Sequence, residues 1–165
     1  MKYDKLLYFC DKCQNMKHLK GYQVQENALM IVEDPSGTYV IRNGYFDYIQ
    51  LSRSGIIKRA LVNLAKQISF SLSELAQVLH ISERTFQRYA DDAKLSADTS
   101  ERAILLSQLY QRGTEVFGHL DDFKEWMRTP LPVFDYQTPI SLLDTTFGFQ
   151  LIQDELGRIE HGIFA

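Results

Sequence analysis

The feature that most constrains the fold is the stretch SLSELAQVLHISERTFQRYAD, from Ser71 to Asp91. Ser71 followed by Glu74 has the spacing of a capping box, which predicts the start of a helix. Apolar residues then recur at helical intervals up to His80. Ser82 predicts the cap of a second helix. The spacing therefore indicates two short helices joined by a tight turn.

Such a pair resembles a helix-turn-helix, whose second helix lies in the DNA major groove with its first residues at the base edges. Phe86, Tyr89 and Ala90 are predicted to face inward. The residues predicted to face DNA are Ser82, Glu83, Arg84, Thr85, Gln87 and Arg88. His80 occupies the turn position that glycine usually holds, where a positive φ costs a non-glycine residue about 1 kcal/mol. The alternative is a helical hairpin that only packs.

Charge divides the chain into three parts. Residues 1–52 carry six basic and six acidic side chains, residues 53–95 seven and four, and residues 96–165 five and eleven. The net charges are therefore 0, +3 and −6. A basic middle suits contacts with phosphate, whereas an acidic final third would be repelled by DNA and needs another partner or none.

Length and composition indicate a soluble protein of one or two domains. The 165 residues contain no apolar run long enough to cross a membrane, and the polar start MKYDK is not a signal peptide. We therefore expect a cytoplasmic protein without a membrane partner. Cys10 and Cys13 have the spacing of half a zinc knuckle, with His18 nearby, but a structural zinc needs four ligands. Reduced thiols are the favoured interpretation, and neither a metal nor a cofactor is predicted.

Three short strands are predicted in the N-terminal third. Asn43-Gly44 is a strong hairpin signal, and residues 34–37, DPSG, have turn chemistry. The strands are expected at residues 29–33, 38–42 and 45–49. Such a small β-meander is marginal alone, so it should pack on the helices or on a second copy. We assign it to an N-terminal extension, residues 1–51, whose role the sequence does not indicate.

The remainder is predicted to be helical, which makes the fold class mainly α. A helix capped by Ser52 or Ser54 should run to Ile68 and support the helix-turn-helix, giving a DNA-binding domain at residues 52–97. A small all-α domain at residues 98–165 follows. Its helices are expected at residues 100–117, from Asp121 to Thr129-Pro130, at residues 140–145 and at residues 146–161, with an extended stretch imposed by Pro130 and Pro132.

The chain ends with Ile163-Phe164-Ala165 just after a helix stop at Gly162. Apolar residues are unusual at a chain end, where polar residues commonly fray. This tail either folds back onto its own core or is held by a partner.

Several stretches taken together resemble the Xre/MbcA/ParS family of antitoxins. They are ISERTFQRY, KLSADTSERAILLSQLY, EVFG, FKEWMRTP, TPISLLDTTFG and LGRIEHGIFA. Their order covers about two thirds of the chain. The sequence departs from the family in two places: LPVFDYQ replaces a glycine-rich turn between Pro130 and Pro139, and residues 1–50 have no counterpart.

The resemblance implies an antitoxin of a type II toxin–antitoxin system. The usual partner in the family is a RES-domain toxin that consumes NAD or, in a related branch, modifies an enzyme by ADP-ribosylation. The C-terminal domain covers the entrance of the toxin's active site, and the helix-turn-helix represses the operon. Helix-turn-helix proteins usually bind operator DNA as two-fold dimers, so a homodimer is expected.

The resemblance and the residue types together give a predicted toxin-binding set. It consists of Trp126, Phe134, Tyr136, Arg158, Glu160, His161 and Phe164. Aromatic residues carry much interface energy, and Phe134 and Tyr136 are expected on an extended loop. Trp126 and Phe149 are equally interpretable as core residues, and His161 as the cap of the last helix.

The alternative function is that of a stand-alone transcriptional regulator. Such a protein would use its C-terminal domain for dimerisation or ligand binding, and an isolated gene without a toxin neighbour would favour it. An enzyme is not predicted, because the sequence contains no nucleophile elbow, phosphate loop or ligand cluster.

Overall fold

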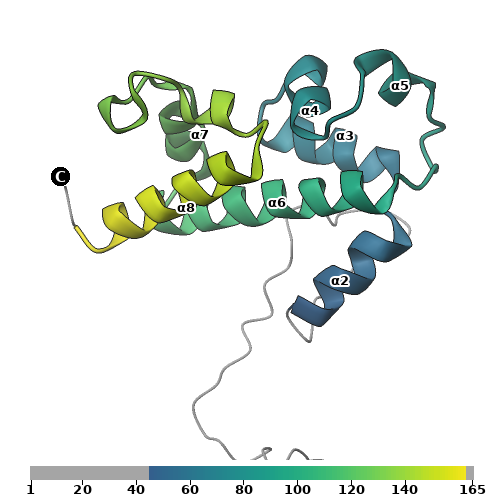
Figure 1. The fold of residues 1–165 in the computed structure, drawn as a ribbon, viewed down its shortest axis with the longest axis horizontal. Helices are drawn as coiled ribbons and strands as arrows, with labels where there is room; N and C mark the ends of the chain where they lie inside the picture. The colour runs from purple at the N-terminus through teal and green to yellow at the C-terminus, as the bar shows by residue number, and fades with distance from the viewer. Residues whose placement is uncertain (1–44, 163–165) are drawn as a thin grey trace, which may run out of the picture.

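The computed structural model describes residues 45–162, and these residues are mainly helical (Figure 1). Its elements are α2 (Tyr45–Ser54), α3 (Lys58–Gln67), α4 (Leu72–Val78), α5 (Glu83–Arg88), α6 (Ala97–Phe117), α7 (Leu120–Arg128), the 3₁₀ helices η3 (Pro132–Phe134) and η4 (Pro139–Leu142), and α8 (Thr146–Glu160). Within this range the β-structure is limited to two isolated bridges, Ile57–Lys94 and Leu131–Gln137. None of the described helices is both long and apolar enough to cross a membrane.

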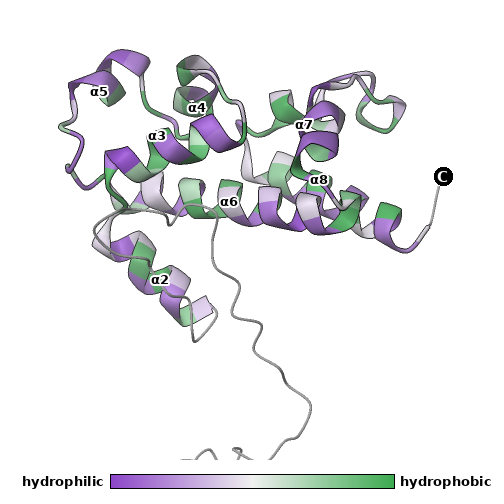
Figure 2. Ribbon diagram, turned by 180° about the vertical axis from the view of Figure 1, so that it is seen from behind, coloured by the Kyte–Doolittle hydropathy of each residue, from purple (hydrophilic) through white to green (hydrophobic). Residues whose placement is uncertain are grey.

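The long helix α6 lies at the centre of the arrangement. Figure 1 shows α3, α4 and α5 on one side of α6, α2 on the opposite side, and α7 and α8 near its C-terminal half. Hydrophobic and hydrophilic residues alternate along α6 (Figure 2), and its packing partners include α2, α7 and α8. Because one helix contributes to the contacts of both halves, their positions are linked through it.

A chain of aromatic rings joins the two halves inside the core. Tyr110 of α6 is 1% exposed. Its ring meets Phe70, which precedes α4, at a centroid distance of 5.7 Å, and Phe123 of α7 at 5.1 Å, both edge-on. Burial raises the pKa of the Tyr110 hydroxyl, because the charged phenolate would be desolvated. One continuous hydrophobic cluster therefore serves both halves.

The helix-turn-helix prediction is confirmed in its main features. The hydroxyl of Ser71 accepts from the backbone N–H of Glu74 at 3.1 Å, and the backbone N–H of Ser71 donates to Glu74 Oε2 at 2.7 Å, which completes the capping box. Ser82 caps α5 by accepting from the N–H of Thr85 at 3.0 Å. The prediction that Ala90 faces inward is wrong: α5 ends at Arg88, and Ala90 is exposed.

The predicted strand at residues 45–49 is wrong, because this stretch opens α2. Tyr48 and Leu51, three residues apart, both pack against the core, a helical rather than an alternating pattern. Gly55, at φ +80°, ends the helix with its N–H directed to the carbonyl of Leu51 at 3.1 Å. The other two predicted strands lie outside the described residues, and no sheet is present within residues 45–162.

The helix predicted to start at Ser52 or Ser54 begins instead at Lys58, after Ile57. The reason is a backbone pairing with a distant segment. The N–H of Lys58 donates to the carbonyl of Ala93 at 3.0 Å, and the carbonyl of Ile56 accepts from Leu95 at 2.9 Å. Distant carbonyls thus satisfy donors that a side-chain cap would otherwise serve.

The helix boundaries of the C-terminal half agree with the predictions to within a few residues. Ser96 caps α6 by accepting from the backbone N–H of Thr99 at 3.3 Å, so the helix begins three residues before the predicted start. α6 ends at Phe117, and α7 ends before Thr129-Pro130, as predicted. α7 begins at Leu120, one residue before the predicted start, so Asp121 lies in its first turn. The stretch predicted to be extended after Pro130 contains η3, and the short helix expected at residues 140–145 is η4.

An ion pair connects the capping box of α4 to the end of α7. Arg128 donates to both carboxylate oxygens of Glu74, at 2.7 and 3.2 Å, and to the carbonyl of Ser69 at 2.8 Å. The hydrogen bonds from Arg128 are the main reason that the pKa of Glu74 is lowered to about 2. The same contact raises the pKa of Arg128.

We predict that the Glu74–Arg128 pair stabilises the fold by about 1 kcal/mol, since both side chains are partly solvated. The folded pKa lies below the ordinary value of 4.5, so the unfolded chain binds the proton first. The contribution is complete above pH 4.5 and is lost as pH falls toward about 2. Denaturant unfolding of the parent and of Glu74→Gln should therefore differ at pH 6 and converge toward about pH 2; a difference that does not change with pH contradicts the prediction.

Gly148→Ala is predicted to destabilise the protein by more than about 2 kcal/mol, because overpacking a close backbone contact forces the chain to move. A Cβ at Gly148 would lie 1.7 Å from the carbonyl oxygen of Leu142. Gly157→Ala is the matched control in the same helix, since a Cβ at this position would meet no atom within 4 Å; it should be neutral or stabilising by up to about 1 kcal/mol. Thermal unfolding of both variants checks the pair, and equal effects would count against this packing.

Candidate DNA-reading and partner-binding surfaces

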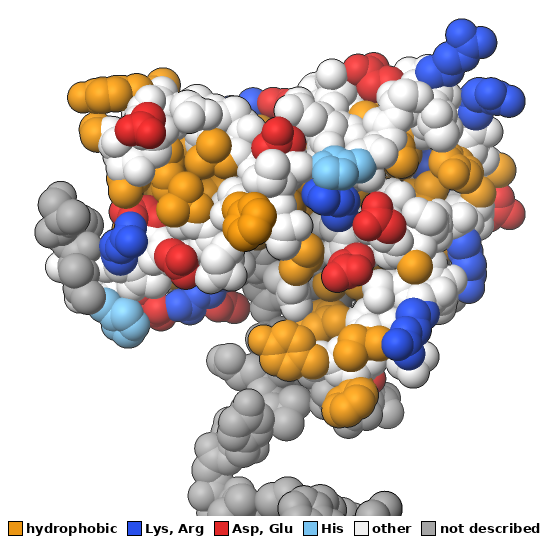
Figure 3. All heavy atoms as spheres, viewed as in Figure 1, with side chains coloured by type: hydrophobic (Ala, Val, Ile, Leu, Met, Phe, Trp, Pro, Cys, Tyr) orange, Lys and Arg blue, Asp and Glu red, His pale blue; other side chains and the backbone are white. Residues whose placement is uncertain are grey.

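The helix α5 presents a polar, partly basic surface. All six residues predicted to face DNA are exposed, namely Ser82, Glu83, Arg84, Thr85, Gln87 and Arg88. Phe86, 1% exposed, anchors the helix from below. Neither Arg84 nor Arg88 takes part in a salt bridge within residues 45–162, and basic side chains project from the end of the molecule that carries α5 (Figure 3). These guanidinium groups are free to meet phosphates or bases.

Intramolecular contacts hold the C-terminal end of α5. Lys58 donates to the carbonyl of Tyr89 at 2.8 Å and pairs with Asp91 at 3.2 Å. Its ammonium lies 5.9 Å from the centre of the Phe86 ring. Lys58 is therefore used in holding α5 on α3, and the acidic residues Asp91 and Asp92 follow the helix instead of lying at its beginning.

His80 adopts the positive φ that the helix-turn-helix turn requires, at 55°. Its Nε2 lies 2.6 Å from the carbonyl oxygen of Asp144, just before α8. Sequence reasoning identified the unusual residue in the turn but not its partner, 64 positions away in the chain. The hydrogen bond fixes the turn against the C-terminal half.

The aromatic residues predicted to contact a partner are divided by the structure. Phe134 is 4% exposed, and its ring packs edge-on against Trp126 at 6.1 Å. The expectation that Phe134 lies on an extended loop is therefore wrong, because the loop folds back and buries the ring. Phe149 is also buried, and Trp126 is half-buried, stacked on Phe123 at 5.7 Å. Tyr136, by contrast, is 74% exposed.

The predicted residues of the terminal motif lie on the last turns of α8. Arg158 is exposed and pairs with Glu155 at 2.7 Å. Glu160 accepts hydrogen bonds from Arg112 of α6. His161 is exposed and ends α8, its backbone N–H directed to the carbonyl of Gly157 at 3.2 Å. Phe164 lies outside the described residues.

In the C-terminal half, sequence reasoning missed three exposed apolar side chains. Phe147 is the most exposed large hydrophobic residue described, at 88%, and Val133 and Leu151 are also exposed. Since Phe149, Ile152 and Leu156 fill the inward face of α8, helical spacing alone places positions 147 and 151 together on another face. Figure 3 shows hydrophobic side chains over the half of the molecule formed by α7, α8 and their connecting loop.

This apolar surface lies in an acidic setting. Residues 112–162 contain four basic and nine acidic side chains, a net charge of −5. Exposed aromatic groups on an acidic stretch of chain suit a partner with an apolar pocket and a cationic rim.

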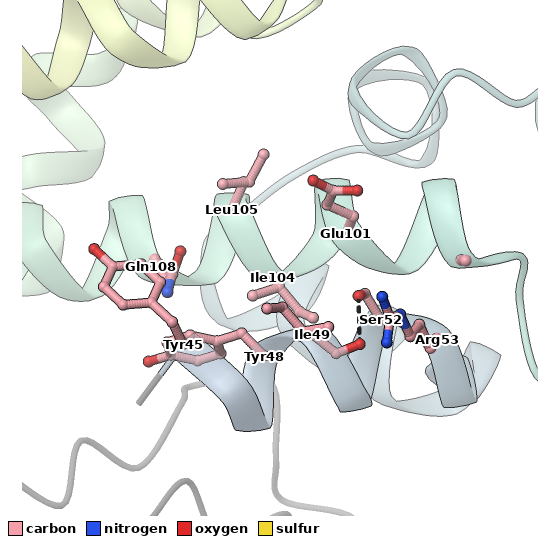
Figure 4. A pocket seen from close by; sticks show the side chains of 10 residues that line it. Tyr45, Tyr48, Ile49, Ser52, Arg53, Glu101, Ile104, Leu105 and Gln108 are labelled. Carbon is pink, nitrogen blue, oxygen red and sulfur yellow. Dashed lines mark hydrogen bonds between the residues drawn. The ribbon is translucent and has the colours of Figure 1, made fainter. Parts of the chain in front are cut away.

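A hollow lies between α2 and α6, outside the predicted sites (Figure 4). It has a volume of about 400 Å³. Tyr48 and Ile49 of α2 face Ile104 of α6 there, and Leu105 is another lining residue. The ring of Tyr45, which also lines the hollow, is exposed, and the charged side chains of Arg53 and Glu101 line it as well.

Comparisons with known proteins place both surfaces in recognised domains. Residues 47–107 match the antitoxin Xre-like helix-turn-helix domain, and residues 112–162 match the antitoxin Xre/MbcA/ParS C-terminal toxin-binding domain. The α5 surface falls in the first domain. The exposed apolar side chains of the loop and of α8 fall in the second.

Two similar proteins are both named antitoxin Xre. The one from Photorhabdus laumondii is 31% identical over 97 residues, which are 58% of this chain and 66% of that protein. The one from Yersinia enterocolitica is 30% identical over 100 residues, 59% of this chain and 67% of that protein. The matched part thus spans about two thirds of each relative. With a helix-turn-helix and a toxin-binding domain in the same order, this chain belongs to the Xre/MbcA/ParS family of antitoxins.

Proposed function

We propose that this antitoxin binds a RES-type, NAD-consuming toxin and blocks its active site with the C-terminal half. The observation that carries the proposal is the exposure of four apolar side chains, Val133, Tyr136, Phe147 and Leu151, within the acidic residues 112–162. A toxin that binds the phosphates of NAD needs a cationic cleft, and a C-terminal stretch of net charge −5 complements it. Such complementarity mainly accelerates association and excludes wrong partners.

The helix-turn-helix supports the further proposal that the antitoxin represses its own operon. Ser82 to Arg88 would meet the major groove, with Arg84 and Arg88 supplying the cationic contacts. Readers of this class bind two half-sites about one helical turn apart, so a homodimer forms part of the proposal.

Toxin neutralisation is tested by co-expression with the product of the adjacent gene. The parent antitoxin should give a stable complex on a sizing column and should relieve the growth arrest that the toxin causes alone. Phe147→Ser should weaken the complex about tenfold or more, because an exposed aromatic anchor loses its apolar contact. Gln150→Ser, at an exposed position of the same helix, is the control and should leave the complex intact.

Persistent growth arrest, with no complex, would contradict neutralisation and favour a stand-alone regulator. A complex that is unaffected by Phe147→Ser would leave neutralisation standing but would move the interface elsewhere.

Operator binding is tested with Arg84→Ala and Arg88→Ala. Each should weaken binding to the promoter DNA of the antitoxin gene by at least about 1 kcal/mol at moderate salt, because a cationic contact is lost. Arg158→Ala, at the end of α8, removes the same charge and should leave DNA affinity unchanged. Electrophoretic mobility shift or fluorescence anisotropy measures all three, and unchanged affinity for both α5 variants would mean that another element reads DNA.

A further inference from the structure

The loop between α7 and η4 is closed by a compact set of backbone hydrogen bonds. The N–H of Leu131 donates to the carbonyl of Gln137 at 3.2 Å, and the carbonyl of Leu131 accepts from Tyr136 at 2.9 Å. At the tip, the N–H of Gln137 donates to the carbonyl of Phe134 at 3.0 Å. Phe134 is itself buried against Trp126. Hydrogen bonds thus hold the base of the loop, and the buried ring of Phe134 fixes it to the core.

The tip has the backbone of a type I′ turn without the residues that favour it. Asp135 and Tyr136 occupy its two central positions, at φ 52° and 59°. A turn of this type strongly prefers Asn-Gly or Asp-Gly, because side chains resist positive φ. Aspartate tolerates this conformation, but a bulky tyrosine does so poorly. Tyr136, at the second position, is therefore strained, and a glycine in its place would relieve the strain.

The Tyr136 side chain contributes little to the stability of the fold. It is 74% exposed. Within residues 45–162 it takes part in no ring contact, and its hydroxyl has no hydrogen bond. Strained residues held by a well-determined surrounding structure concentrate at functional sites. Here the surrounding structure is the anchored loop, and the strained residue is an aromatic ring directed to solvent.

We propose that Tyr136 is a specificity-determining anchor for the toxin, presented in a fixed position by this strained turn. The inference rests on the proposed function and adds to it the residue that selects the partner. Val133 on the same loop is also exposed, and the loop lies within residues 112–162, which match the toxin-binding domain. The site fits a toxin whose surface offers an apolar pocket for one phenol ring. Because the turn is already formed, little conformational entropy is lost when the ring is buried.

The test uses the full-length antitoxin, the toxin encoded by the adjacent gene, and two glycine variants. Tyr136→Gly should raise the Kd at least about tenfold, in the range of an interface hot spot, while Tm stays equal to or above that of the parent, because strain is relieved. Asp135→Gly relieves strain at the adjacent position but keeps the ring. Its Kd should stay within about threefold of the parent value, because the ring is kept and a single exposed charge contributes little. Isothermal titration calorimetry and thermal unfolding measure both quantities.

The outcomes separate this inference from the proposed function. If the parent binds the toxin and Tyr136→Gly binds within about twofold of it, the anchor is refuted and neutralisation stands. A lower Tm for Tyr136→Gly would also refute it, since the ring would then serve the fold. If the parent itself does not bind the toxin, both proposals fail.

Discussion

The two halves of the structure depend on the burial of one ring, that of Tyr110, between Phe70 and Phe123. Edge-on aromatic pairs add about 0.5–1.5 kcal/mol to the free energy gained from burying their area. Removing any of the three rings would open a cavity at the joint of the two halves. The ring belongs to α6, so the helix that carries it is common to the DNA-reading half and to the partner-binding half. The outward-facing surfaces of both halves therefore rest on a single hydrophobic core.

Two polar contacts cross the same joint at its surface. Glu74 accepts from Arg128 while it also completes the capping box with Ser71, so one carboxylate both starts α4 and holds α7. His80 and the carbonyl of Asp144 meet at the turn of the helix-turn-helix. An isolated surface pair contributes little to stability. These contacts, however, lie at the edges of a packed core and fix the angle between the two halves. The surface of α5 and the surface of α8 are therefore carried on one framework, with their separation set by α6.

Local chemistry predicted the structure well where a short stretch of chain is sufficient. The caps formed by Ser71 with Glu74 and by Ser82 each act within a few residues, and both were predicted from the sequence. Predictions failed where a distant segment intervened. Lys58 begins α3 because Ala93 supplies a carbonyl, and residues 45–49 are helical because Tyr48 and Leu51 find a face of α6. Phe134, expected outside, is buried because its loop closes on itself and returns the ring to Trp126.

The sequence by itself determined the helix-turn-helix, the division of charge between a basic middle and an acidic end, and the family to which the chain is similar. These properties follow from neighbouring residues and from composition, which need no knowledge of distant contacts. Only the tertiary structure decided which aromatic side chains remain exposed. Exposure depends on what packs against a residue, and nothing local distinguishes the buried Phe134 from the exposed Tyr136 two positions later. The candidate partner surface, with Phe147 as its most exposed member, was therefore visible only in the fold.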